Sequence, residues 1–218
     1  MRNIEKRILT SIIIFPLSIF FIIKGGSYLV SFLYAVLILG NFEVFSVFKK
    51  KFSIIFLDVI LVSSLLSILF LRNETTSSFV LLIWAITITV SSDIGGYVFG
   101  KLFKWKKLTK ISPNKTLSGV LGSFVFSLST VFLLGFIVEI VSGIESNSFF
   151  KTRYFVLAII FSIAAQLGDL TISYLKRLEK IKDTGKILPG HGGIFDRIDG
   201  LIFVIILAYI VYNLKLFP

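Results

Sequence analysis

Residues 173–199 hold the densest mixture of chemically active side chains in this sequence. They read SYLKRLEKIKDTGKILPGHGGIFDRID and contain six basic residues, four carboxylates, four glycines and the only histidine. The segment lies between two long apolar runs, and charges at such a boundary are costly to bring near hydrocarbon. A dense mixture of both signs there indicates a site for a charged ligand, and we expect that ligand to be a metal-bound phosphate.

The second half of this segment has the features of a phosphate and metal site. Between Lys182 and Phe195 the helical periodicity breaks at glycines, and such turns can direct backbone N–H groups toward phosphate oxygens. Asp196 and Asp199 follow at a spacing of three, and Mg²⁺ is typically held by one or two carboxylates together with substrate phosphates. The Walker A and Rossmann glycine spacings are both missing. His191 stands alone, which excludes a histidine-based zinc site; it either binds phosphate or stabilises a turn.

Two carboxylates inside apolar runs, Asp93 and Asp169, each lead a polar helix face. The Asp93 face continues at i+3, i+4 and i+7 through Gly96, Tyr97 and Gly100. Close helix packing around a buried hydrogen bond explains this face as well as a functional role does. The Asp169 face continues at i+4, i+7 and i+8 through Ser173, Lys176 and Arg177. Here we expect function, because pairing within the helix leaves the many neighbouring charges unexplained.

A second basic centre lies in residues 101–116 and ends in the motif SPNKT. Lysines at a membrane interface attract anionic lipid head groups, which accounts for most of the cations in this loop. The motif itself is more specific. Its proline-initiated turn starts at Ser112 and leads to Lys115 and Thr116 at the start of an apolar run, so it can present a cation, a hydroxyl and free N–H groups to a phosphate.

The composition predicts one integral membrane domain over residues 1–218. Of the 218 residues, 56% are hydrophobic and only 16% are charged, and the mean hydropathy is +0.94. Runs of about 20 apolar residues can span roughly 30 Å of hydrocarbon. Seven candidate runs occur, at residues 8–23, 27–48, 52–71, 79–100, 117–141, 154–175 and 198–216. We therefore expect an all-α bundle of about seven transmembrane helices, and the lack of cysteine excludes disulfides and thiolate metal sites.

The distribution of basic residues predicts how this bundle is oriented. If the N-terminus is cytoplasmic, 18 of the 23 lysines and arginines fall in cytoplasmic segments, as the positive-inside rule requires. Both basic centres then face the cytoplasm. Because the net charge of +11 is carried by these short loops, we expect no nucleic-acid partner.

The C-terminal pattern resembles the signature of the phosphatidate cytidylyltransferases, also called CDP-diacylglycerol synthases. The matching positions are Ser173-Tyr174-Leu175-Lys176-Arg177, Lys182-Asp183, Pro189-Gly190-His191-Gly192-Gly193 and Asp196-Arg197-Ile198-Asp199. Asp93, the SPNKT turn and Gly168-Asp169-Leu170 are also similar to family features, so the likeness covers most of the chain. One departure is Ser118, which stands where the family often has an acidic residue, and we assign it no catalytic role.

The resemblance implies Mg²⁺-dependent transfer of a cytidylyl group from CTP to phosphatidic acid, which yields CDP-diacylglycerol and pyrophosphate. It implies that Asp169 and Asp196 hold the metal, and that Lys115 and Ser112 close the site from the facing loop. The catalytic residues would be Asp169, Lys176, Arg177, Asp183, Asp196, Arg197 and Asp199. The substrate-binding residues would be Asp93, Ser112, Lys115, Thr116, Ser173, Lys182, Gly190, His191, Gly192 and Gly193. The enzyme would lie in a bacterial cytoplasmic membrane with its site facing the cytoplasm, and the family suggests a homodimer.

Three rival functions differ from this prediction in their sequence requirements. A transporter would place interrupted helices in two related halves, and no such halves occur. The motif of a CDP-alcohol phosphatidyltransferase would begin with DGxxAR. Asp199-Gly200 matches its first two positions, but only apolar residues follow, so the motif is absent. A cytidylyltransferase or kinase that acts on another lipid is the nearest alternative, because the sequence does not distinguish head-group pockets.

Overall fold

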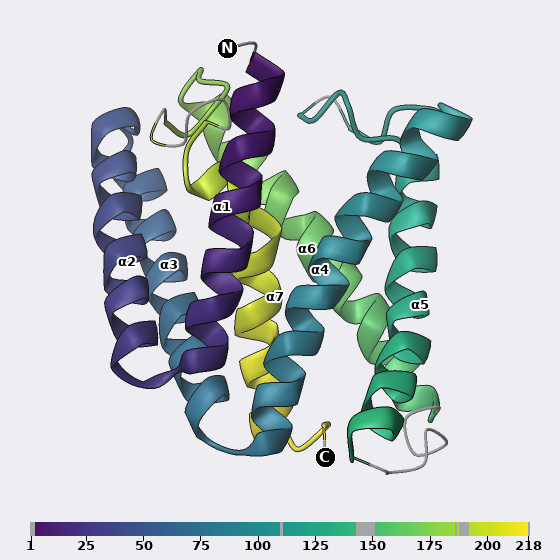
Figure 1. The fold of residues 1–218 in the computed structure, drawn as a ribbon. Helices are drawn as coiled ribbons and strands as arrows, with labels where there is room; N and C mark the ends of the chain where they lie inside the picture. Colours follow the sequence, from purple (N-terminus) through teal and green to yellow (C-terminus); the bar gives the residue numbers. More distant parts are fainter. Residues whose placement is uncertain (1–2, 110, 143–150, 186, 188–191, 218) are drawn as a thin grey trace.

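Seven helices make up the secondary structure of the described part of the chain, as the apolar runs predict (Figure 1). The computed structural model describes residues 3–109, 111–142, 151–185, 187 and 192–217, with the side chains of 3–13 and 136–142 left out. The helices are α1 (Asn3–Lys24), α2 (Gly26–Val47), α3 (Lys51–Asn73), α4 (Thr76–Phe103), α5 (Leu117–Ser142), α6 (Thr152–Leu178) and α7 (Phe195–Asn213). In the loop between α4 and α5, an isolated antiparallel bridge joins Lys107 to Thr116.

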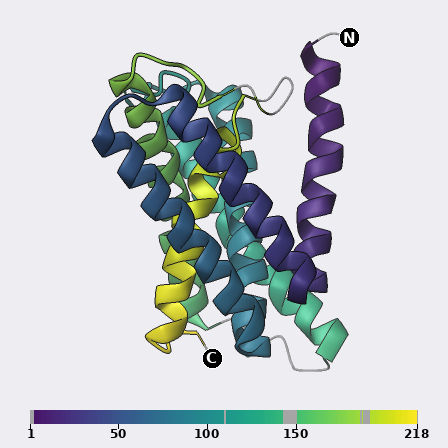
Figure 2. The same cartoon turned by 90° about the vertical axis from the view of Figure 1, so that its left-hand side faces the viewer.

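The helices form a polytopic membrane bundle, which confirms the predicted fold class. Among the described residues five helices, α2 to α6, are long and apolar enough to cross a membrane. The last helix, α7, has 19 residues and carries three charges among its first five, because it begins at Phe195, just before the apolar run that starts at residue 198. It contacts α3, α4 and α6 and so lies inside the bundle, whereas α1 runs along one side (Figure 2).

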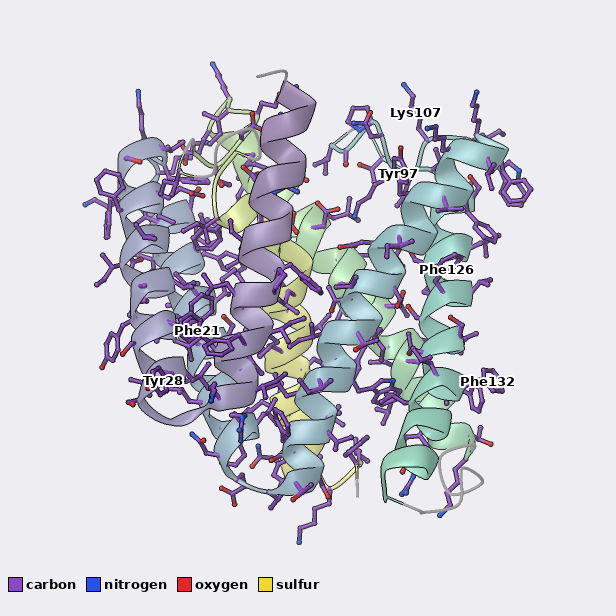
Figure 3. All side chains as sticks on the ribbon, viewed as in Figure 1. Phe21, Tyr28, Tyr97, Lys107, Phe126 and Phe132 are labelled. Atoms are coloured by element: carbon purple, nitrogen blue, oxygen red, sulfur yellow. The ribbon has the colours of Figure 1, made fainter. Side chains whose placement is uncertain are left out.

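The outward face of the bundle is apolar and aromatic. Tyr28 and Phe132 are more than half exposed, and Figure 3 shows them on the outside of their helices. Lys107 lies instead at one end of the bundle, on the loop between α4 and α5 (Figure 3). Exposed side chains of this kind suit a lipid environment, where apolar surface needs no burial and cations belong at the polar interface.

Glycines bring α4 and α5 into very close contact. A Cβ on Gly95 would lie 2.7 Å from the Cβ of Phe126 and would overlap the backbone of Gly122. At the next residue, a Cβ on Gly96 would lie 2.8 Å from the Ser123 hydroxyl. Because interfaces between membrane helices gain mainly from close packing, these small residues hold α4 and α5 together. The Asp93 face predicted from the sequence is therefore in part a packing face.

A second close contact joins α6 to α7. A Cβ on Gly168 would lie 2.7 Å from the carbonyl oxygen of Asp199, and a Cβ on Gly200 would lie 2.9 Å from the carbonyl oxygen of Ala165. The residue that follows Gly168 is Asp169, so this crossing brings two of the predicted site carboxylates into one region.

Candidate functional site

The predicted site residues gather at the end of the bundle where α2, α4 and α6 end and α5 and α7 begin (Figure 1). A polar pocket of about 240 Å³ opens there between α4, α5, α6 and the loop before α5. Its lining includes five of the predicted site residues: Asp93, Ser112, Lys115, Thr116 and Asp169. Three segments that are separate in the sequence thus form one polar pocket.

The ion pair in this pocket joins Lys115 to Asp169. The Lys115 Nζ lies 2.6 Å from Oδ2 of Asp169, and it also donates to the carbonyl oxygen of Gln166 at 3.3 Å. The Ser173 hydroxyl donates to Oδ1 of Asp169 at 3.3 Å, across one helical turn. The pair is partly open to solvent, with 23% of the Lys115 side chain and 32% of the Asp169 side chain exposed. A phosphate in the pocket would therefore meet a cation that a single carboxylate holds in place.

Backbone hydrogen bonds in the loop fix the position of Lys115. The N–H of Leu108 donates to the Lys115 carbonyl at 2.8 Å, and the Lys115 N–H donates to the Ser112 carbonyl at 3.1 Å. The Thr116 hydroxyl then accepts the N–H of Gly119 at 3.1 Å, which satisfies a free donor at the start of α5. The SPNKT motif is thus a turn whose last residue caps a helix.

A second ion pair, between Lys176 and Asp196, joins α6 to the first turn of α7. The Lys176 Nζ lies 2.7 Å from Oδ1 of Asp196, and the side chains are only 11% and 9% exposed. The other oxygen, Oδ2, accepts the N–H of Thr184 at 2.8 Å and the N–H of Gly193 at 3.0 Å. Asp196 therefore has protein donors on both oxygens, and it orients Lys176 from the opposite side.

Sequence reasoning missed Glu43 as a member of this region. Glu43 lies near the end of α2 and is 1% exposed. Its carboxylate accepts the hydroxyl of Thr184, the N–H of Ile194 at 2.7 Å and the N–H of Phe195 at 3.3 Å. A lone carboxylate in an apolar run needs donors to offset its burial, and that requirement was the available signal. The donors could not be named because they lie more than 140 residues away along the chain.

Glu179, just after α6, ties the same end of the bundle together outside the pocket. Its carboxylate accepts the N–H of Lys49 at 3.2 Å, the N–H of Lys50 at 3.0 Å and the hydroxyl of Ser53 at 3.0 Å. Desolvation raises the pKa of this carboxyl, but the backbone donors Lys50 and Lys49 and the Ser53 hydroxyl together lower it below its ordinary value. Glu179 thus holds the turn between α2 and α3 against the end of α6.

An apolar pocket of about 350 Å³ lies beside the polar one, between α1, α4 and α7. Ile14, Ile19 and Ile22 of α1 line it together with apolar residues of α4 and α7. Asp93 lines both pockets, and Arg197 and Asp199 join it in the apolar one. The described residues thus place an apolar chamber and a polar chamber on either side of one carboxylate.

The remaining predicted residues lie at the rim or outside the described part. Arg177 is exposed, and it donates to the carbonyl oxygen of Ile181 at 3.0 Å. Lys182 and Asp183 are exposed and line a separate pocket at the end of α2. Gly192 has a φ of +87° and packs against Asp196. Gly190 and His191 fall outside the described residues.

The carboxylates of the site have the donor chemistry for a hard divalent cation. Asp93, Asp169 and Asp199 lie close enough to interact electrostatically. In the part of the chain that the structure describes, no three Asp, Glu or His side chains form a group that could hold a metal ion by themselves. Mg²⁺ ordinarily takes one or two carboxylates and completes its shell with water and substrate phosphates, so these residues fit a metal that arrives with a nucleotide.

Comparison with known proteins identifies a family and several curated relatives. The model of the cytidylyltransferase family matches residues 48–215. Over 124 residues the chain is 43% identical to a phosphatidate cytidylyltransferase of Helicobacter pylori, a match that covers 57% of this chain and 44% of the relative. A Brucella suis protein of the same name is 35% identical over 148 residues, or 67% of this chain and 52% of the relative. A Rickettsia conorii protein of that name is 33% identical over 213 residues, a match that covers 95% of this chain and 90% of the relative. The chain thus spans about half the length of the first two relatives and nearly all of the third.

Proposed function

The chain belongs to the cytidylyltransferase family, and from that premise we propose that it transfers the cytidylyl group of CTP to phosphatidic acid. In this reaction a phosphate oxygen of phosphatidic acid attacks the α-phosphorus of CTP. The bond between the α- and β-phosphates breaks, and CDP-diacylglycerol and pyrophosphate leave. The names of the relatives support this substrate pair.

The observation that carries the proposal is the pairing of the two pockets. The polar pocket offers Lys115 and Asp169, as a phosphate-transfer site requires, and the adjoining apolar pocket offers a surface for acyl chains. Because Asp93 lines both, the phosphate of a lipid whose chains occupy the apolar pocket would come next to the polar one. Transfer of this type depends on positioning and charge neutralisation rather than on covalent help from the protein.

The metal of the proposal is Mg²⁺, with Asp169 as its first ligand. Asp93 and Asp199 are the neighbouring carboxylates, and Asp196 could join them only if Lys176 moved away from it. When bound, Mg²⁺ would neutralise charge on the triphosphate. Lys115 would hold a phosphate oxygen, and Lys176, oriented by Asp196, would provide a second cation at the α6 side of the site. Arg177 and Arg197 would neutralise phosphate groups at the rim.

We further propose that the site faces the cytoplasm of a bacterial cell, as the distribution of lysine and arginine favours. The bundle places the start of α1 and the site at the same end (Figure 1). A second copy of the chain is the proposed partner in the membrane.

The test is transfer of label from α-phosphate-labelled CTP into lipid by the purified protein in micelles that contain phosphatidic acid. We expect labelled CDP-diacylglycerol with Mg²⁺, none after chelation, and at least a 100-fold loss in Asp169→Asn. Label that appears only with a different lipid phosphate would replace the acceptor and keep the reaction class. A folded protein that binds no CTP would refute the proposal.

A further inference from the structure

We propose that Glu43 is a positioning residue, whose carboxylate anchors Thr184, Ile194 and Phe195 so that Asp196 and Lys176 are held in register at the nucleotide site. The inference rests on the proposed function. It extends the working parts of the protein to α2, which precedes the segment 48–215 that the family model matches.

The carboxylate of Glu43 is buried and fully engaged. Glu43 lies one turn before the end of α2, and its carboxylate contacts the connection from α6 to α7. One oxygen accepts the Thr184 hydroxyl and the N–H of Phe195 at 3.3 Å, and the other accepts the N–H of Ile194 at 2.7 Å. Thr184 and Ile194 belong to the α6–α7 connection and Phe195 is the first residue of α7, so this single side chain ties two separate parts of this region to α2.

The backbone of this connection is shaped to fit the carboxylate. A Cβ on Gly193 would collide with Oε1 of Glu43 and with the Thr184 hydroxyl. A Cβ on Gly185 would lie 2.8 Å from Cγ of Glu43. Any side chain at these two positions would push the connection away from α2, which explains why glycine occupies both.

The anchored residues are the ones that orient Asp196. The Thr184 hydroxyl donates a hydrogen bond to Glu43, and the Thr184 N–H donates one to Oδ2 of Asp196 at 2.8 Å. Gly193, which packs against Glu43, gives its N–H to the same oxygen at 3.0 Å. The opposite oxygen of Asp196 holds Lys176. Glu43 thus acts on Lys176 only through the loop and Asp196, which makes it a positioning residue.

Glu43→Gln tests this chain of contacts with little change in volume. In the wild type both oxygens of Glu43 accept hydrogen bonds. The glutamine amide keeps one acceptor oxygen, but its NH₂ group would face a hydrogen-bond donor of the connection. Two donors repel each other, so the connection must move away. Displacement of a reacting group by about 1 Å can cost roughly 100-fold in rate. We therefore expect kcat for cytidylyl transfer to fall by about 100-fold, with a smaller change in KM for CTP.

The matched control is Glu179→Gln. Glu179 also accepts three hydrogen bonds at this end of the bundle, but from Lys49, Lys50 and Ser53, not from the α6–α7 connection. Hydrogen–deuterium exchange of peptides that cover residues 184–195 measures the anchor directly, without any assumption about the reaction. Faster exchange and a lower kcat in Glu43→Gln, with neither change in Glu179→Gln, is the expected result.

Thr184 supplies a second and milder pair of variants. Thr184→Val removes the hydroxyl, which Glu43 accepts and which also lies 3.1 Å from Oδ2 of Asp196, and it should reproduce a smaller loss of kcat. Thr184→Ser keeps the hydroxyl and should keep activity near that of the wild type. These variants carry the test if Glu43→Gln does not fold. Faster exchange with an unchanged kcat would overturn the proposal, because Glu43 would then contribute only to stability. An unchanged exchange rate would show that Glu43 does not anchor the connection. If the wild type transfers nothing to phosphatidic acid, the proposed function fails, while the exchange data still decide whether Glu43 anchors the loop.

Discussion

The two ion pairs at the site differ in burial, and this difference predicts how much each lysine contributes to stability. The Lys176–Asp196 pair is 11% and 9% exposed, whereas the Lys115–Asp169 pair is 23% and 32% exposed. Removal of one partner from a buried pair typically costs about 3–5 kcal/mol, because the remaining charge loses its compensation. An accessible pair is typically worth about 0.2–1 kcal/mol.

Replacement of each lysine by methionine, which has a similar length, separates the two cases. For Lys176→Met we expect a loss of about 3 kcal/mol, the lower end of the range for buried pairs. The reason is that Asp196 keeps the N–H groups of Thr184 and Gly193 as partners. For Lys115→Met we expect a loss of about 1 kcal/mol or less. Both variants should lose cytidylyl transfer, because each removes a cation from the proposed phosphate site.

Thermal unfolding of both variants in the same detergent is the assay, with transfer measured on the same samples. For a chain of this size, 1 kcal/mol corresponds to roughly 2–4 °C in Tm, so Lys176→Met should lower Tm by roughly 6–12 °C and Lys115→Met by at most roughly 4 °C. Equal shifts in the two variants would refute the link from burial to stability. Full transfer activity in either variant would refute its proposed contact with phosphate.

Three further predictions follow from packing, from the apolar pocket and from pH. Gly95→Ala should lower the free energy of unfolding by about 1–3 kcal/mol, because the new methyl group would overlap the α5 backbone. Gly100→Ala is the control in the same unfolding assay: its methyl group would lie no closer than 3.2 Å to another atom, so the change should be nearly neutral. Ser18→Trp would fill the apolar pocket and should raise KM for phosphatidic acid several-fold with KM for CTP unchanged; Phe20→Trp, outside the pocket lining, is the control. Because the folded-state pKa of Glu179 is lowered, its carboxylate stabilises the fold above its ordinary pKa of 4.5, and this contribution is lost as pH falls through the lowered value. The difference in Tm between wild type and Glu179→Gln should therefore shrink below pH 4.5, and a constant difference would contradict the assignment.

The helices could be predicted from the sequence because hydrophobic length alone defines a membrane span. The sequence also placed Asp196 and Asp199 at the start of the last span, and α7 begins at Phe195. What the sequence did not provide are the partners of Asp196, which lie on α6 and in the α6–α7 connection and stabilise a charged first turn. Periodicity within a single segment carries no information about such partners.

The site could be predicted only in part, for the same physical reason. Residue types and spacing pointed to Asp93, Asp169 and the SPNKT turn, and the structure places these in one pocket. Which cation pairs with which carboxylate depends on helix crossings at Gly168 and between α4 and α5, and no spacing rule encodes these contacts. Glu43 was not predicted because its donors are mostly backbone N–H groups. Nearly every residue has such a group, so the sequence does not show which ones a buried carboxylate binds.

The charge balance of the site explains why the proposed nucleotide should bind together with its metal. Asp93, Asp169 and Asp199 interact with one another, and the Lys115 ammonium is bonded to Asp169 in this group. The triphosphate of free CTP would therefore lie close to three carboxylates, whose like charge opposes its binding. A divalent cation carried by the triphosphate would reduce that repulsion, because these carboxylates could then serve as its ligands. Binding of CTP to the protein should accordingly weaken on chelation, and Asp169→Asn should reduce this dependence on Mg²⁺ while it also reduces turnover.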